Sequence, residues 1–208
     1  MHQSIINLNN IQNSIKSNQV NTSNRNSIKI IAVSKTFEMD HISPLVEYGH
    51  KDFGENKVQE ALKKWEPVKI KYKNISLHLI GKLQSNKTKM ALKIFDYIHS
   101  LDNEKLANRI SDEQKSLEKK PKLFIQVNIG NEEQKNGIDP DKLKSFYQHC
   151  LDKDLNVIGT MCLPPLNEKP EKYFIKMNQL NKNLGLKELS MGMSGDYISA
   201  IEHNATYI

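Results

Sequence analysis

The sequence predicts an α/β fold: a single (β/α)8 barrel of the TIM-barrel type. Short runs rich in β-branched residues alternate with helical patterns along the whole chain, which gives seven or eight βα units. Parallel strands joined by crossover helices produce this alternation. An open, doubly wound sheet usually has about five or six strands, so the larger number of units favours a closed barrel.

No linker divides the 208 residues into two domains. We therefore expect an N-terminal helix and polar link over residues 1–27, followed by one barrel over residues 28–208. The first helix is predicted because Ile5, Leu8 and Ile15 fall on one helical face. A barrel of this type usually takes ~250 residues. This one is expected to be compact and to have a truncated C-terminal end, inside its eighth strand.

Strands are predicted where apolar, β-branched runs are bounded by turn residues. Leu123–Val127 is the clearest example. The expected strands are residues 28–33, 52–54, 75–80, 97–100, 123–127, 157–161 and 189–191, with the start of an eighth at 205–208.

The segments between the strands have helical periodicity. In the best example, Leu143, Phe146 and Cys150 follow the i, i+3, i+7 spacing. Asp139 is the predicted N-cap of that helix, with Pro140 at its first position. The expected helices are residues 40–48, 57–65, 86–95, 103–118, 140–151, 173–184 and 197–201, with Pro44 near the start of the first and Gly49 and Gly185 as stops.

The composition excludes several classes of function. The net charge is +6, but only 2 of the 30 basic residues are arginine, the residue suited to bidentate readout of bases and phosphates. We therefore expect no nucleic-acid partner. No apolar run approaches the ~18 residues of a membrane span, and no signal peptide is visible. Two cysteines suggest neither disulfides nor a metal site, so a cytoplasmic protein is expected.

The active face of such a barrel lies at the C-terminal ends of its strands. Lys35 follows the first predicted strand. An ammonium at the end of an apolar strand is expected to be partly desolvated, which favours the neutral, nucleophilic amine. Lys35 is therefore a candidate Schiff-base lysine. The alternative is an ordinary lysine that extends into solvent.

Two further polar residues lie on the next strands. Asn56 follows the second strand, where its amide can bind a ligand or cap the next helix. His78 lies within the third strand, as either a hydrogen-bonded core histidine or a pocket residue. The following Gly81-Lys82 segment lacks the glycine that precedes the lysine of a P-loop.

The segment Ser190–Asp196 after the seventh strand is rich in hydroxyls and glycines. Hydroxyls and free backbone N–H groups ahead of a helix can hold a phosphate. Loops after strands seven and eight are the usual phosphate site of barrels. Pyridoxal 5′-phosphate (PLP) would explain a phosphate site and a reactive amine on one face.

Six segments, in order, resemble the pyridoxal phosphate homeostasis proteins, small barrels related to the cofactor domain of alanine racemases. Together they span residues 28–208. The segments are Ala32–Lys35, Phe53–Glu60, His78–Lys87, Gln126–Asn128 with Lys135 and Gly137, Gly159–Pro164, and Ser190–Ser194 with Asp196.

The resemblance implies a monomeric, non-catalytic protein of vitamin B6 homeostasis that holds PLP as a Schiff base on Lys35. It also implies that Ser190 and Thr206 are phosphate ligands, and that Asn56 and His78 line the cofactor pocket. No catalytic residue and no metal are implied.

The chain departs from the family pattern at three places. Lys57 stands where the family usually has tyrosine, and Asn204-Ala205 precedes Thr206 where the family has Gly-Ser. The sequence also ends at Ile208, before the family's Arg-Ile-Gly. Each lost charge-assisted hydrogen bond would weaken cofactor binding by ~1.5–3 kcal/mol. Two other hypotheses stay open: a racemase-like PLP enzyme, and a degenerate barrel that no longer binds PLP.

Overall fold

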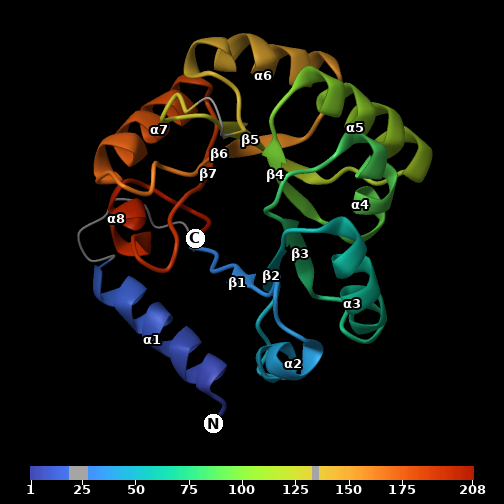
Figure 1. Ribbon diagram of the computed structural model, residues 1–208, viewed down its shortest axis with the longest axis vertical. Coiled ribbons are helices and arrows are strands. Elements are labelled where there is room, and N and C mark those ends of the chain that lie inside the picture. The colour runs from blue at the N-terminus through green and yellow to red at the C-terminus, as the bar shows by residue number, and fades with distance from the viewer. Residues whose placement is uncertain (19–27, 133–135) are drawn as a thin grey trace.

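The computed structural model describes residues 1–18, 28–132 and 136–208, and it shows a parallel sheet surrounded by helices (Figure 1). Seven strands follow one another in chain order, and each is hydrogen-bonded in parallel to the next. The predicted parallel α/β fold is confirmed. Lys135 and most of the expected polar link lie outside the described residues.

Helices on the outside and side chains on the inside cover both faces of the strands, which explains their largely unbroken apolar runs. All five residues of β4, for example, are buried. The strands are β1 (Ala32–Val33), β2 (Asp52–Glu55), β3 (Ser76–Leu79), β4 (Tyr97–Leu101), β5 (Lys122–Val127), β6 (Val157–Cys162) and β7 (Glu188–Ser190).

The helices occur where the sequence predicts them, and α1 contacts α2 and α8. They are α1 (Gln3–Asn18), α2 (Met39–Glu47), α3 (Val58–Lys71), α4 (Thr88–Ile94), α5 (Glu104–Leu117), α6 (Leu143–Asp152), α7 (Glu171–Asn183) and α8 (Tyr197–Glu202), with short 3-10 turns η2 (Ser85–Lys87) and η3 (Pro140–Lys142). None of the described helices is both long and apolar enough to cross a lipid bilayer.

Residues 205–208 lie between β7 and the chain that leads into β1. Tyr207 forms a parallel bridge with Ser190 on one side and with Lys29 on the other. The backbone N–H of Lys29 donates to the carbonyl of Thr206 at 2.8 Å. The C-terminus therefore lies beside β1 (Figure 1), and the segment predicted to begin an eighth strand is paired on both sides.

The apolar core has two layers. The outer layer lies between the strands and the helices, where the rings of Phe53 and Trp65 are 4.7 Å apart and both are fully buried. The inner layer lies on the other face of the strands. This inner cluster consists of Tyr97, Phe124, Met161 and Tyr207, with Ile31 and Ile158 packed against it.

Four details differ from the sequence prediction. The first strand, expected over residues 28–33, is only two residues long, and Lys29 before it forms an isolated bridge. Helix α3 continues through Pro67 to Lys71 instead of ending at residue 65, because Trp65 and Val68 pack against the core and outweigh the hydrogen bond lost at proline. Pro44 lies inside α2, not near its start.

Asp139 is the N-cap of η3 with Pro140 at its first position, as predicted, but its side chain makes no capping hydrogen bond. The Asp139 carboxylate lies 3.2 Å from the Lys142 ammonium, η3 follows it, and α6 begins only at Leu143. A local ion pair thus replaces the capping hydrogen bond.

Candidate functional site

Lys35 lies two residues after β1, at the end of the sheet where the strands terminate. Its side chain is exposed, and within the described residues it has no hydrogen-bond or ion-pair partner. The partial desolvation expected from the sequence is therefore not found, because β1 ends at Val33, which is itself 45% exposed. The structure instead provides an exposed amino group at the end of the sheet where the strands terminate.

The loop that carries Lys35 is held by Lys64 of α3. The Lys64 ammonium donates to the carbonyl oxygens of Ser34 at 2.7 Å and Phe37 at 3.1 Å. It also pairs with the fully buried carboxylate of Glu55 at 2.7 Å. Sequence reasoning missed Lys64 and Glu55, although a glutamate directly after an apolar strand was a signal. These contacts fix the loop on both sides of Lys35.

Asn56 lies at the same end of the sheet, in the loop after β2. It does not cap α3, whose N-cap is Lys57 without a side-chain hydrogen bond. Its backbone packs against Gly81 in the loop after β3, where a Cβ atom would lie 2.4 Å from the Asn56 carbonyl oxygen. Glycine at position 81 therefore allows these two loops to touch.

His78 lies on β3 and is completely buried beside the inner cluster. Its ring stacks on Tyr97, with 4.2 Å between the ring centroids. Its Nε2 atom lies 3.0 Å from a carboxylate oxygen of Asp52, and its Nδ1 atom lies 2.9 Å from Nε2 of His99. His78 is thus a hydrogen-bonded histidine inside the sheet, and its contact with a cofactor stays a prediction.

The hydrogen bonds continue from His78 to the end of β7. The Nδ1 atom of His99 lies 2.9 Å from the hydroxyl oxygen of Ser190. We call Asp52, His78, His99 and Ser190 the inner polar chain; its members come from β2, β3, β4 and β7. Asp52 and His99 were not predicted. The available signal was the presence of polar residues within otherwise apolar strands.

The charges of the inner polar chain follow from its surroundings. Burial holds the pKa of His99 well below its usual value, and a charge on His78 would lower it further. Burial also lowers the pKa of His78, although its bond to Asp52 acts in the opposite direction. Burial alone would raise the pKa of Asp52, but the hydrogen bond from His78 and nearby positive charges lower it.

The two predicted phosphate ligands are neighbours in the fold, but their hydroxyl groups bond to different partners. Ser190 ends β7 and bonds inward to His99. The Thr206 hydroxyl oxygen accepts the backbone N–H of Leu189 at 2.8 Å. Its role as a phosphate ligand stays a prediction. In the loop that follows, the described residues offer no acceptor for the backbone N–H groups of Gly192, Ser194 and Gly195.

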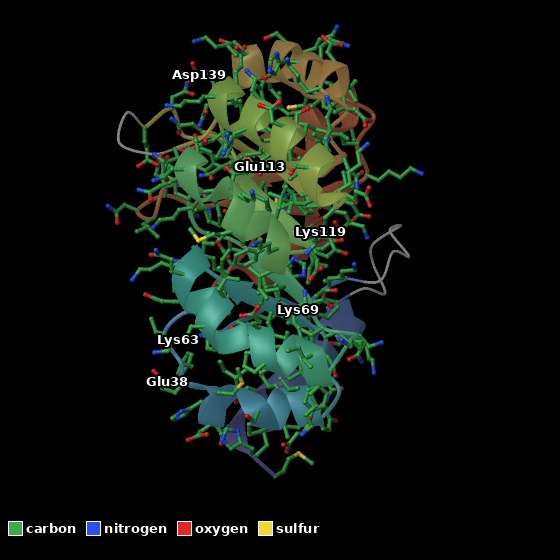
Figure 2. All side chains as sticks on the ribbon, turned by 90° about the vertical axis from the view of Figure 1, so that its right-hand side faces the viewer. Glu38, Lys63, Lys69, Glu113, Lys119 and Asp139 are labelled. Atoms are coloured by element: carbon green, nitrogen blue, oxygen red, sulfur yellow. The ribbon has the colours of Figure 1, made fainter. Side chains whose placement is uncertain are left out.

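A basic cavity of about 350 Å³ lies at the opposite end of the sheet, where β3, β4 and β5 begin. Lys69 and Lys119, both labelled in Figure 2, pair with Asp96 near this cavity. Lys122, which also lines it, donates to the hydroxyl of Tyr97 at 3.2 Å. We do not assign the cofactor to this cavity, because it lies far along the strands from Lys35.

The described part of the chain offers neither a metal-type cluster nor a reactive thiol. It contains no cluster of three or more His, Cys, Asp or Glu side chains arranged to hold a metal ion. Burial raises the pKa of both Cys150 and Cys162 to about 12, so neither thiol is a nucleophile at neutral pH.

Comparison with known proteins first shows the structural class of the chain, the N-terminal domain of alanine racemases. The family described as "Alanine racemase, N-terminal domain" matches residues 6–208. An alanine racemase structure from Clostridium difficile superposes with a TM-score of 0.67 at 13% identity, over 92% of this chain and 52% of that one. At that identity the likeness shows the fold alone.

Relatives with higher sequence identity show to which family within this class the chain belongs. The pyridoxal phosphate homeostasis protein of Aquifex aeolicus is 38% identical over 193 residues, which cover 88% of this chain and 84% of that protein. The one from Synechocystis is 36% identical over 192 residues, or 88% of each chain. This chain belongs to the pyridoxal phosphate homeostasis protein family, as the six sequence segments indicated.

A solved relative shows the cofactor directly. PipY of Synechococcus elongatus, whose structure was determined with PLP bound, superposes with a TM-score of 0.81 at 33% identity. The match covers 95% of this chain and 94% of PipY. A second PipY structure, without PLP, gives a TM-score of 0.80.

Proposed function

We propose that this chain binds PLP, takes part in PLP homeostasis without catalysing a reaction, and attaches the cofactor covalently to Lys35. The observation that carries the proposal is the exposed amine of Lys35, free of partners in the described residues, at the same end of the sheet as the Ser190 loop. Family membership and the PLP-bound structure of PipY support it.

The proposal includes a closed barrel in which residues 205–208 act as the eighth strand. The bridges from Tyr207 to Ser190 and Lys29 support this closure. One strand then separates β1 from β7. With about 4.8 Å between neighbouring strands, the strands of Lys35 and Ser190 lie about 10 Å apart. A lysine side chain and a substituted pyridine ring can span that gap together.

The residues present have the right chemistry for the cofactor. The three backbone N–H groups of Gly192, Ser194 and Gly195 that find no acceptor in the described residues can donate to a phosphate. Bound PLP supplies an aldehyde, an electrophile for a primary amine. Lys35 Nζ would attack that aldehyde carbon and release one water molecule, while Lys64 holds the loop in place.

The other predicted ligands have smaller roles in this proposal. Asn56 would contact the cofactor from the loop after β2, at the same end as Lys35. His78 would act through His99 and Ser190, because it is buried below the mouth of the sheet. Thr206 would position Leu189, and through it the end of β7.

The test is the substitution Lys35→Ala. The wild-type protein incubated with PLP should develop an absorbance band near the edge of the visible range. Borohydride reduction should then add the mass of the reduced cofactor to the peptide that contains Lys35. Lys35→Ala should show neither effect, because it lacks the amine. Lys63→Ala, which removes an exposed lysine on α3, is the matched control and should behave as wild type.

Two results would contradict the proposal. A band and mass shift that persist in Lys35→Ala would place the cofactor on another residue. Exchange of the α-proton of an amino acid for deuterium by the PLP-loaded protein would show that the chain is a racemase-like enzyme and not a carrier.

A further inference from the structure

The hydrogen bonds of the inner polar chain all run in one direction, because the carboxylate at one end can only accept hydrogen bonds. An ionised Asp52 carboxylate accepts, so His78 Nε2 must carry the hydrogen between them. In a neutral His78 the Nδ1 atom is then an acceptor, and His99 Nε2 must donate to it. His99 Nδ1 is in turn an acceptor, so the Ser190 hydroxyl donates its only hydrogen inward.

This direction holds for the free protein at neutral pH. Asp52 is ionised because its pKa is lowered, and both histidines are neutral because their pKa values are lowered. The Ser190 oxygen consequently offers only lone pairs to a ligand outside the chain. A phosphate dianion at Ser190 would meet those lone pairs, an arrangement without a hydrogen bond.

We infer that binding of a phosphate ester at Ser190 is coupled to the uptake of one proton by the inner polar chain and the phosphate together. The inference rests on the proposed function, and it assigns Asp52, His78 and His99 as positioning residues for the phosphate.

The proton balance does not depend on where the proton resides. Three hydrogens occupy the chain in the free protein: one each on Ser190, His99 and His78. If Ser190 donates to the phosphate, His99 must donate to Ser190. The two remaining hydrogen bonds, to His78 and Asp52, are then both formed only with one additional hydrogen, on either histidine or on Asp52, which makes four. If Ser190 keeps its inward bond, the phosphate must itself donate, as a monoanion. In either case the complex holds one proton more than free protein plus phosphate dianion.

Binding without this proton would leave a buried acceptor unpaired. With the Ser190 hydrogen turned outward, His99 Nδ1 faces a lone pair at 2.9 Å. A buried polar group that loses its partner is strongly disfavoured. The proton can reach the chain from solvent at Asp52, whose side chain is 19% exposed.

Charged and aromatic groups from several elements surround the inner polar chain. Lys29, which lies 5.1 Å above the ring of Tyr97, opposes a charge on His78, and Asp96 favours it. His99 stacks on Phe124 with 4.3 Å between the ring centroids. The aromatic and titratable groups that face the two histidines are Asp52 from β2, Tyr97 from β4, Phe124 from β5, and Tyr207 from the C-terminal segment.

The experiment uses the full chain and pyridoxine 5′-phosphate, which has the phosphate but no aldehyde and therefore cannot react with Lys35. Calorimetric titrations at about pH 8, in buffers with different heats of ionisation, measure the protons taken up. This pH is about two units above the second pKa of a phosphate monoester. The wild type should take up close to one proton per ligand, and its affinity should fall about tenfold per unit of rising pH.

Asp52→Asn separates this role from a merely structural one. The asparagine amide can donate to His78 Nε2, which reverses every hydrogen bond in the chain without an added proton. The variant should take up no proton, and its affinity should stay constant with pH and exceed that of the wild type above about pH 8. Ser190→Ala should also show no uptake, and it covers the case that Asp52→Asn does not fold. Asp112→Asn, an exposed aspartate on α5, should keep the wild-type uptake.

The outcomes distinguish the inference from the proposed function. A wild type that binds pyridoxine 5′-phosphate without proton uptake, or an Asp52→Asn variant that still takes up the proton, overturns the inference alone. A protein that binds neither this ligand nor PLP overturns the proposed function and the inference together.

Discussion

Single residues in this structure depend on partners that are distant in sequence. His78 was identified as a polar residue in an apolar strand, but its partners Asp52 and His99 come from other strands. No local pattern states which residues of two strands face each other, so the inner polar chain was not predictable. The exposure of Lys35 depends likewise on where β1 stops pairing.

The buried His99 predicts a dependence of stability on pH. Its pKa is held well below the usual value in the folded protein, whereas in the unfolded chain it is about 6.5. Below about pH 6.5 the unfolded state therefore binds a proton that the folded state does not, and the free energy of unfolding falls by up to about 1.4 kcal/mol per pH unit. In His99→Phe this contribution should disappear, while the smaller one of His78 remains.

The measurement is urea unfolding of both proteins between about pH 5 and 7, and the slope with pH, not the absolute stability, is compared. His99→Phe also breaks the bonds to His78 and Ser190, so its stability at pH 7 should be lower. The exposed His41→Phe is the control for loss of a histidine, and it should keep the wild-type slope. Equal slopes for wild type and His99→Phe would show that His99 is charged in the folded state.

At the scale of elements, hydrophobic period and turn residues predicted most strands and helices to within a few residues. The stops at Gly49 and Gly185 were correct, and both glycines have positive φ angles. The errors occurred where tertiary contacts outweigh a local rule. Packing of Trp65 carries α3 through Pro67, and the Asp139 side chain pairs with Lys142 instead of making a capping hydrogen bond.

The pairing of β6 with β7 depends on the absence of a side chain at Gly159. This residue is in register with Glu188, and a Cβ atom would lie 1.9 Å from the Glu188 carbonyl oxygen. Because that oxygen belongs to the backbone, the strands must separate in Gly159→Ala, at a cost of about 1–3 kcal/mol in stability. Urea unfolding measures this loss. Gly195→Ala, which meets no atom within 4 Å, should cost much less; equal losses would contradict the steric argument.

For the whole molecule, the alternation of strands and helices predicted the parallel sheet, and six short segments predicted the family. Neither predicts how the first and last strands meet, because that contact joins residues about as far apart as the chain allows. In the structure Tyr207 makes this connection, between Lys29 and Ser190. Its ring packs in the inner cluster and lies 5.0 Å from the Lys29 ammonium.

If Tyr207 closes the barrel, removing its ring should weaken both neighbouring strands at once. Tyr207→Ala should cost about 3–5 kcal/mol of the free energy of unfolding, as for other large buried side chains, and Tyr207→Phe about 1 kcal/mol, because only the hydroxyl is lost.

Hydrogen exchange shows where in the sheet this loss of stability occurs. The amide of Ile31 donates to Ile208, and that of Met191 donates to Tyr207, so these amides report on the two seams of the C-terminal segment. Both should lose protection together in Tyr207→Ala, whereas Tyr48→Ala, at a half-exposed site on the surface, should leave both protected. Loss of protection at Met191 alone would mean that the segment is anchored to β1 independently of the ring, and that the barrel does not close as one unit.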